Sequence, residues 1–355
     1  MKKMVIIFAG LAVIGLTFAG VFIFMKKQMA KIPSMTAKEC LDYTLKDKED
    51  AIITIGIIKD GHTSWDVYGK DGKKISSKLH TYEIGSLTKT ITATLICKAA
   101  DEGKICIDDT IDKYLDLPQD KEYPTIADLL THTSGYKEYY LESPMVKNFF
   151  TGKNSFYGIS DEMFLKRIAR VDVSKADKSW RYSNFGFATL GQILEAVYDC
   201  EYTEMANEFL LEQGMGNSHI STGDGDLGKY WDWEKDDAYI PAGAVVSDIE
   251  DMLIYAGHQF DEDGLFSKMH NSLKEVNATP SDWEQMDIHV DAMGMGWIID
   301  ETNGIIWHNG GTGDYNCYVG FCPETKTAVV VLSNLSPGYK IPSTVIGIKK
   351  IKEIQ

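Results

Sequence analysis

Strand-forming segments occur near both ends of this chain and enclose a long middle part with helical patterns. A β-branched run over residues 51–59 is followed by Asp60-Gly61, a turn signal, and by a second strand-like segment over 62–68, so a hairpin is expected. Four further strand-like segments lie near the other end, at 293–299, 304–307, 318–321 and 327–332. Because a lone hairpin cannot bury its apolar face, the simplest fold joins both ends of the chain into one antiparallel sheet.

Helices are expected beside this sheet and throughout the middle of the chain. Residues 35–50 and 346–354 have helical patterns and flank the predicted strands. The helical patterns of the middle part lie at 125–130, 163–168, 185–197 and 205–211. The sequence therefore predicts an α+β domain over residues 32–355, with its sheet at about 35–85 and 290–355 and a mainly helical insertion at about 86–289.

Residues 1–31 differ sharply from the rest in composition. Met4 to Met25 holds no charged residue, and lysines flank this run on both sides. Its 22 residues would extend about 33 Å as a helix, which is enough to cross a bilayer. A secretory signal usually has a shorter apolar region and a small-x-small cleavage site. We therefore expect one transmembrane anchor at the cell membrane with the domain outside the cytoplasm; secretion after signal cleavage is the alternative.

Composition also limits which partners and cofactors we expect for this chain. The formal net charge of −16 argues against binding to nucleic acid. The six cysteines form no C-x-x-C pair, and most are expected to be buried free thiols, although Cys97 with Cys106 or Cys317 with Cys322 could form a disulfide outside the cytoplasm. No H-E-x-x-H motif, Cys/His cluster or glycine-rich phosphate loop occurs, so no metal and no cofactor are expected.

The first candidate for chemistry is Ser86, which stands three residues before Lys89 at the start of a segment with apolar residues at helical spacing. In such a helix the side chains of Ser86 and Lys89 share a face. The free backbone N–H groups at the helix start favour negative charge that develops there. A desolvated lysine can then activate the serine as a nucleophile. A plain helix N-cap is the competing interpretation, and the motif alone does not decide between them. A second S-x-x-K, from Ser134 to Lys137, contains Gly135 directly after the serine, which disfavours a helix start there.

The second motif is Tyr182-Ser183-Asn184, the one Y-x-N among the 18 tyrosines, just before the predicted helix at 185–197. A phenolate can take a proton from a serine, provided that a cation such as Lys89 lowers the pKa of the tyrosine. The amide of Asn184 can hydrogen-bond to a substrate amide or to the lysine. Taken alone, a turn tyrosine and a capping asparagine explain this motif as well.

The third motif is His308-Asn309-Gly310-Gly311, at the end of a predicted strand. Its glycines would let a ligand approach the backbone closely. A backbone N–H here, paired with that of Ser86, would form an oxyanion hole, and His308 could donate a hydrogen bond to a substrate carboxylate. The alternative is a glycine-rich hairpin with an incidental histidine.

Together, in this order and at strand–helix borders, the three motifs resemble the serine β-lactamase and penicillin-binding-protein superfamily. Over about residues 35–355, the chain resembles most the branch of class C β-lactamases, D-alanyl-D-alanine carboxypeptidases, D-amino-acid peptidases and related esterases. Connecting segments resemble this family too, at 103–109, 126–135, 242–247 and 294–297. The resemblance implies a β-lactamase/transpeptidase-like fold, with helices from both chain ends on the sheet.

The resemblance also implies roles for individual residues. Ser86 would be the acylated nucleophile, and Lys89 and Tyr182 would share the work of a general base. The side chains of Asn184 and His308 would contact the substrate, as would Gly310. The backbone N–H groups of Ser86 and Gly311 would form the oxyanion hole. His132 lies in a family segment that is mainly structural and is not assigned a catalytic role.

Departures from the family pattern bear on the substrate. No S-D-N motif is present, and His308 stands where a K-T-G motif has lysine, so a substrate carboxylate would meet a weaker, pH-dependent charge. In the family such a histidine is more usual in carboxypeptidases, D-peptidases and esterases than in efficient β-lactamases. We therefore expect a membrane-anchored serine hydrolase that cleaves amide or ester bonds of short peptides with D-residues. The alternatives are a β-lactamase and a non-catalytic penicillin-recognising sensor; the loops at 135–160 and 212–240 would set substrate choice.

Overall fold

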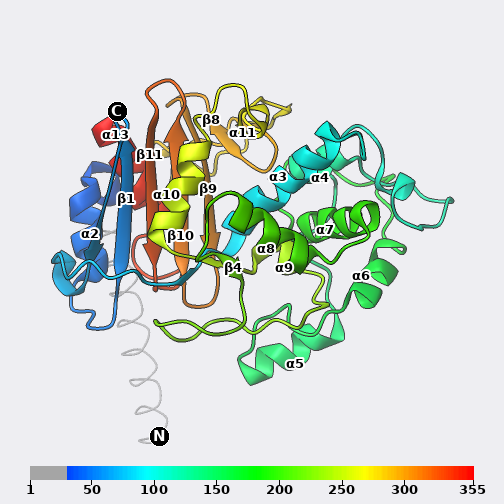
Figure 1. The fold of residues 1–355 in the computed structure, drawn as a ribbon, viewed down its shortest axis with the longest axis horizontal. Coiled ribbons are helices and arrows are strands. Elements are labelled where there is room, and N and C mark those ends of the chain that lie inside the picture. Colours follow the sequence, from blue (N-terminus) through cyan, green and yellow to red (C-terminus); the bar gives the residue numbers. More distant parts are fainter. Residues whose placement is uncertain (1–29) are drawn as a thin grey trace, which may run out of the picture.

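An eight-stranded antiparallel sheet forms the centre of the computed structural model, which describes residues 30–355. The strand order is β2-β1-β11-β10-β9-β8-β7-β6 (Figure 1). The strands are β1 (Ile53–Lys59), β2 (His62–Tyr68), β6 (Lys274–Glu275), β7 (Ala292–Met293), β8 (Ile298–Asp300), β9 (Ile305–Gly311), β10 (Asn316–Cys322) and β11 (Thr327–Ser333). Because β1 pairs with β11, the sheet joins the two ends of the chain, and the predicted antiparallel α+β fold is confirmed.

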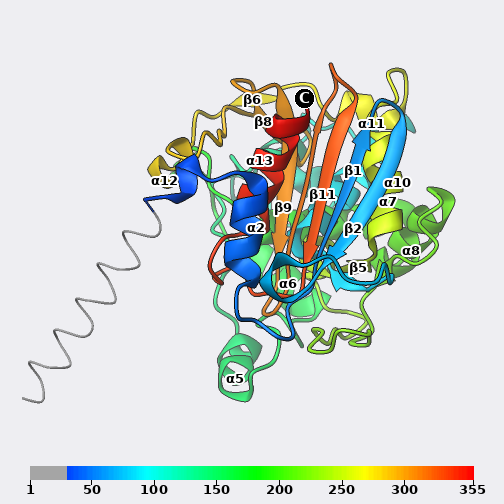
Figure 2. The ribbon, with the colours of Figure 1, turned by 90° about the vertical axis from the view of Figure 1, so that its left-hand side faces the viewer.

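Two helices from the chain ends cover one face of this sheet, and one helix from the middle covers part of the other (Figure 2). α2 (Ala37–Leu45) and α13 (Ser343–Ile354) pack together on the first face, as predicted. α10 (Ile249–His258) lies on the opposite face against β1 and β11, although it belongs to the middle of the chain. Gly56 permits this contact, since a Cβ there would lie 2.8 Å from a methyl carbon of Leu253.

Most of the remaining elements form the mainly helical part beside the sheet (Figure 1). Its helices are α3 (Thr88–Asp101), α4 (Ile126–Leu130), α5 (Ser143–Thr151), α6 (Asp161–Ile168), α7 (Asn184–Tyr198), α8 (Tyr202–Glu212), α9 (Ile240–Gly243) and α11 (Leu265–Lys268). α12 (Ser281–Glu284) instead lies near α2, where its Trp283 packs against Trp307 of β9 (Figure 2). A small second sheet contains β3 (Tyr82–Glu83), β5 (Val245–Ser247) and β4 (His219–Ile220) in that order. Short 3-10 turns are η1 (Ile32–Ser34), η2 (Lys70–Gly72), η3 (Gly85–Leu87) and η4 (Ile111–Lys113).

One predicted strand is divided in the structure. The segment 293–299 forms the end of β7 and the start of β8, with a turn between them in which Gly294 N donates to the carbonyl of Trp297 at 2.9 Å. Gly296 has φ +71°, a left-handed conformation that residues with a Cβ rarely adopt. The apolar residues around these glycines give a strand-like pattern, but the backbone turns there.

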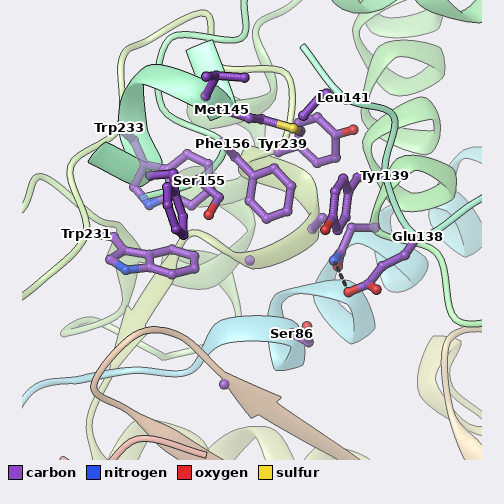
Figure 3. Close-up of a pocket in the computed structure, with 16 residues that line it drawn as sticks. Ser86, Glu138, Tyr139, Leu141, Met145, Ser155, Phe156, Trp231, Trp233 and Tyr239 are labelled. Atoms are coloured by element: carbon purple, nitrogen blue, oxygen red, sulfur yellow. Dashed lines mark hydrogen bonds between the residues drawn. The ribbon is translucent and has the colours of Figure 1, made fainter. Parts of the chain in front are cut away.

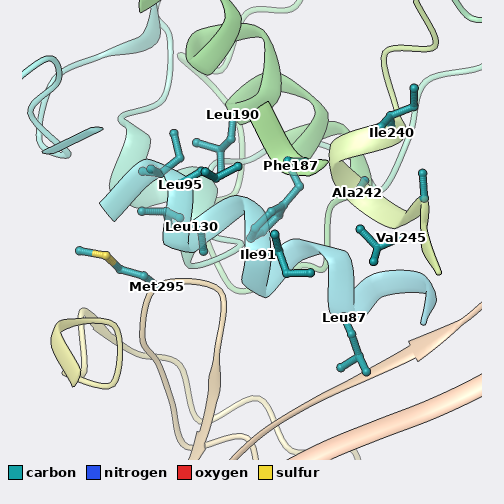
Figure 4. Close-up of a cluster of buried hydrophobic side chains, with 14 of the residues drawn as sticks. Leu87, Ile91, Leu95, Leu130, Phe187, Leu190, Ile240, Ala242, Val245 and Met295 are labelled. Carbon is teal, nitrogen blue, oxygen red and sulfur yellow. The ribbon is translucent and has the colours of Figure 1, made fainter. Parts of the chain in front are cut away.

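α3 is buried nearly all the way round and forms the centre of the molecule (Figure 4). Leu87, Ile91 and Leu95 pack against apolar side chains from the neighbouring elements, among them Phe187 and Leu190 of α7. The buried threonines of α3 are satisfied locally or by neighbours; for example, the hydroxyl groups at 90 and 94 donate to carbonyls one turn earlier. A helix without a solvent-facing side is held on all sides, so side chains at its start are fixed in position.

Two sequence-based expectations concern the chain ends and the thiols. The anchor expected at residues 1–31 falls almost entirely outside the described residues, and in residues 30–355 no helix is both long and apolar enough to cross a membrane. All six cysteines are free thiols, so neither of the two possible disulfides forms, and four of the six are buried, as expected for most of them.

Candidate active site

Ser86 lies in η3, where the chain meets the end of β9 backbone to backbone. Gly85 has φ +53°, and a Cβ there would lie 2.6 Å from the backbone nitrogen of Gly311. A Cβ on Gly310 would lie 1.8 Å from the carbonyl oxygen of Ile84. Such distances are far below van der Waals contact, so only glycine fits at both positions. The two glycines bring Ser86 and Gly311 to the wall of one cleft, as the oxyanion-hole hypothesis requires.

The amine of Lys89 is fully buried beneath Ser86 and contacts three oxygen atoms. Its Nζ lies 2.9 Å from Ser86 Oγ, 2.7 Å from Asn184 Oδ1 and 2.6 Å from the carbonyl oxygen of Ala242. A neutral amine has two N–H groups and one lone pair. If the two N–H groups donate to Asn184 and Ala242, the lone pair faces the Ser86 hydroxyl, which can donate to it. This arrangement suits a general base.

Burial favours the neutral form of this amine. Removal from water lowers the pKa of Lys89 well below its usual value, while the carboxylate of Glu138 raises it by less. In the described part of the chain Lys89 forms no ion pair, and its partners are a hydroxyl, an amide oxygen and a carbonyl. The amine is therefore available as a proton acceptor near neutral pH.

The pH dependence of stability tests this environment. Unfolding returns Lys89 to water and restores a pKa of about 10.4, so between its two pKa values the unfolded chain binds one more proton than the folded chain. Stability must then rise with pH across this window, by up to about 1.4 kcal/mol per pH unit. We expect the free energy of unfolding of the wild-type chain to increase, relative to Lys89→Met, from about pH 7 to about pH 9 in urea titrations. A difference that stays constant with pH would mean that Lys89 is charged in the folded protein.

Tyr182 is half-buried beside the lysine and is held by His132. The amine of Lys89 lies 5.0 Å from the centre of the Tyr182 ring, and the His132 ring packs against the tyrosine with the ring centres 4.5 Å apart. Ser183 N donates to His132 Nδ1 at 3.1 Å, which fixes the backbone of this loop. His132 thus supports the tyrosine rather than joining the chemistry.

The protonation state of Tyr182 differs from the sequence-based hypothesis. Burial raises the pKa of the Tyr182 phenol, and the interaction with Ser86 lowers it by less. The phenol therefore keeps its proton at neutral pH. Tyr182 can still pass a proton between the serine, the lysine and a leaving group.

His308 is completely buried in β9 and does not line the cleft. Its ring lies 6.2 Å from that of Tyr182, centre to centre, and its Nδ1 donates to the carbonyl of Asn309 at 2.6 Å. Among residues 30–355 its Nε2 finds no hydrogen-bond partner, and burial lowers the pKa of His308 to about 3. The histidine is therefore neutral at physiological pH, and the structure places it behind the surface that a substrate would touch.

A cleft of about 560 Å³ opens above Ser86 (Figure 3). Ser86, Asn184 and Gly311 line its floor together with Ala242 and Gly243. Its walls are the apolar and aromatic side chains of Tyr139, Leu141, Met145, Val146, Phe149, Phe156, Trp231, Trp233 and Tyr239, with Glu138 and Ser155. These walls come from the two loop regions that the sequence analysis associates with substrate choice.

The S-x-x-K at Ser134 lies apart from this machinery. Ser134 is buried, its Oγ accepts from Tyr136 N at 3.2 Å, and it does not line the cleft. Gly135 has φ +77°, so the segment forms a turn and no helix start. Of the two motifs, only the one at Ser86 combines a buried amine with an accessible hydroxyl.

A family model described as Beta-lactamase matches residues 41–343. The chain belongs to the beta-lactamase family. This membership confirms the superfamily that the three motifs indicate, and it agrees with the expectation of an enzyme of the serine-hydrolase type.

Three proteins similar to this beta-lactamase family member have 18–23% sequence identity to it. Protein flp of Staphylococcus aureus (strain NCTC 8325 / PS 47) is 22% identical over 300 residues, which cover 76% of this chain and 56% of flp. This chain thus spans about half the length of that relative. The penicillin-binding protein homologue of Pyrococcus abyssi, an octamer, matches with a TM-score of 0.68 and 23% identity over 95% of this chain and 77% of its own. The beta-lactamase/D-alanine carboxypeptidase of Yersinia pestis matches with a TM-score of 0.71 and 18% identity; the match covers 91% of this chain and 97% of the Yersinia chain. These two likenesses concern the fold alone.

Sequence reasoning missed three parts of this family member's site. The carbonyl of Ala242 accepts from Lys89, but a backbone acceptor leaves no trace in residue type. Glu138 hydrogen-bonds to Asn184, and its position next to Tyr139 gives no periodic signal. The role of His132 in holding Tyr182 depends on a contact between segments 50 residues apart in the chain, which only the fold brings together.

Proposed function

We propose that this chain is a serine hydrolase that cleaves amide or ester bonds of short peptides with D-residues through an acyl-enzyme. The observation that carries the proposal is the buried amine of Lys89, which lies 2.9 Å from Ser86 Oγ and whose pKa is lowered well below its usual value by burial. A serine needs such a base to act as a nucleophile, and a plain helix cap does not. The choice of peptides with D-residues follows from the family resemblance.

The proposed acylation step uses Ser86, Lys89 and the two backbone N–H groups at the cleft floor. Ser86 Oγ bonds to the substrate carbonyl carbon as its proton moves to Lys89, and the carbonyl electrons move to oxygen. The N–H groups of Ser86 and Gly311 would stabilise that oxyanion. The intermediate then breaks its bond to the leaving group, which takes the proton from Lys89 directly or through the Tyr182 phenol.

Release of the acyl group repeats these steps with water. Lys89 accepts a proton from a water molecule whose oxygen attacks the ester carbonyl of acylated Ser86. The second oxyanion collapses with departure of Ser86 Oγ, which recovers its proton. Free acid leaves, and the enzyme returns to its starting state without a further reactant.

A serine-reactive fluorophosphonate probe tests the nucleophile. We expect the full-length chain in detergent to become labelled at Ser86, as located by peptide mass mapping. Ser86→Ala should not be labelled, whereas Ser134→Ala should be labelled at the wild-type rate, because Ser134 is buried away from Lys89. Labelling that persists in Ser86→Ala, or that disappears only in Ser134→Ala, would refute the assignment.

Two alternative functions are distinguished by turnover. A β-lactamase should hydrolyse a chromogenic cephalosporin with a kcat/KM close to that for D-peptides. A non-catalytic sensor should become acylated at Ser86 but release the acyl group very slowly, so that labelled protein accumulates without product. We favour hydrolysis because the neutral amine beside Ser86 can activate water as well as the serine.

We also propose that residues 1–31 anchor the chain in the cell membrane with the domain outside the cytoplasm. The uncharged run of 22 residues from Met4 to Met25 supports this. The full-length chain should remain in the membrane fraction after an alkaline carbonate wash and keep its original N-terminus. A mature N-terminus beyond Met25 would instead establish a cleaved signal.

A further inference from the structure

Among residues 30–355, Glu138 is the one charged residue that lines the cleft (Figure 3). No lysine or arginine in the described part of the chain lines this cleft, and the neighbouring Lys137 is exposed outside it. Glu138 forms no ion pair within residues 30–355; its carboxylate accepts one hydrogen bond, from Asn184 Nδ2 at 3.5 Å. The cleft therefore offers a negative charge without a protein cation to balance it.

This carboxylate lies next to the reacting groups. Asn184, which donates to Glu138, also accepts from Lys89, and Lys89 contacts Ser86 Oγ. The backbone holds Glu138 in this place, because Phe185 N donates to the Glu138 carbonyl at 2.9 Å. A group bound by Glu138 would thus be only a few bonds from a carbonyl positioned on Ser86.

Apart from the backbone N–H groups of the proposed oxyanion hole, the described residues that line the cleft offer no cationic side chain to an anion. His308, the residue expected to bind a substrate carboxylate, is buried behind the cleft floor and is neutral at physiological pH. A carboxylate on the substrate would lose water and meet Glu138 with no cation for compensation. An ammonium in the same place would gain an opposite charge, because Glu138 presents its exposed carboxylate at the cleft.

The aromatic walls complete this recognition site. Trp231 and Trp233 stand at one side with ring centres 6.2 Å apart, and Phe156 stacks on Tyr239 at 4.3 Å. Trp231 is fixed because its backbone N–H donates to the buried carboxylate of Glu83 at 2.6 Å. Such walls bind an apolar side chain, and their faces also attract cations.

We propose that Glu138 selects acyl donors that carry a positively charged amine beside the scissile carbonyl and an apolar side chain, as in a peptide or ester with a free amino group. The inference rests on the proposed hydrolase function and narrows its substrate class. The proposal assigns this amine to the acyl portion, which stays beside Ser86 during both acylation and release. Substrates with a carboxylate in this position are rejected.

Three p-nitroanilides with the same six-carbon acyl chain test the proposal on the full-length enzyme in detergent. D-norleucine p-nitroanilide carries the free amine, and its counterparts carry hydrogen or a carboxylate at that position. We expect kcat/KM for the amine to exceed that for hydrogen by at least about 10-fold, with the carboxylate slower still. In Glu138→Gln the ratio of amine to hydrogen should fall towards one, and in Glu138→Asp it should stay above that of Glu138→Gln.

Controls separate charge recognition from loss of structure. Glu250→Gln removes an exposed carboxylate on α10, which does not line the cleft, and should keep the wild-type ratio. Raising NaCl from about 20 mM to about 500 mM should reduce the ratio in the wild type but not in Glu138→Gln. A wild-type ratio near one overturns the proposal, as does a Glu138→Gln variant in which both substrates slow equally and the ratio is unchanged.

The same experiment distinguishes failure of the inference from failure of the proposed function. If the probe labels Ser86 and the p-nitroanilides turn over without preference for the amine, only the substrate class is wrong. If Ser86 is not labelled and none of the three p-nitroanilides turns over, the hydrolase function itself fails.

Discussion

Lys89→Met should lower kcat/KM for any substrate of this chain by at least about 10³-fold. Methionine has nearly the length of lysine but no lone pair that can accept the Ser86 proton. At neutral pH an unassisted serine hydroxyl is a weak nucleophile, so acylation should become the slow step. Steady-state turnover and the rate of probe labelling should therefore fall together.

Lys89→Arg separates base chemistry from charge. A guanidinium stays protonated at any accessible pH and cannot act as a base. We expect it to be as inactive as methionine, because the site needs a neutral amine and not a positive charge. If either variant kept a tenth of the wild-type turnover, Lys89 would not be the general base, and the 2.9 Å contact with Ser86 would be structural only.

Gly310→Ala should damage both stability and chemistry. The new Cβ would lie 1.8 Å from the carbonyl oxygen of Ile84 and 3.1 Å from Ser86 N, so η3 and β9 must move apart. We expect the free energy of unfolding in urea to fall by about 1–3 kcal/mol. Because displacement of reacting groups by about 1 Å can cost about 10²-fold in rate, labelling of Ser86 should slow by about that factor.

Gly216→Ala is the matched control for this substitution. No atom of residues 30–355 lies within 4 Å of a Cβ built at Gly216, and its φ is not in the left-handed region. Stability and labelling should be close to those of the wild type. If Gly310→Ala behaved like Gly216→Ala, the close contact between the two backbones would not be needed for the site.

The sheet and the nucleophile helix were predictable because their signals are local. The β-branched runs that became β1 and β11 and the apolar spacing after Ser86 have the periods of strand and helix. The S-x-x-K motif likewise needs only one helical turn to bring its two side chains together. Helix α5 was not predicted; of its three apolar side chains that line the cleft, Met145 is buried but Val146 and Phe149 are exposed, so its sequence lacks a continuous apolar face.

The parts of the site that could not be predicted depend on contacts between distant segments. His308 occupies a strand position whose side chain faces α3, and only the packing of the helical part on that face shows that it is buried. The neutrality of Lys89 and of His308 likewise follows from burial, which residue type alone does not give. The substrate-facing charge of Glu138 became visible only when the walls of the cleft were assembled.

The backbone contact between η3 and β9 also links activity to the completion of synthesis. A nascent chain that ends before β9 already contains Ser86, Lys89 and Tyr182, but it lacks Gly310 and Gly311. Strand β1 must likewise wait for β11, and such pairings between distant segments form late in folding. Truncated or stalled chains are therefore inert, and a nucleophile encoded in the first third of the sequence becomes usable only when the last third has folded onto it.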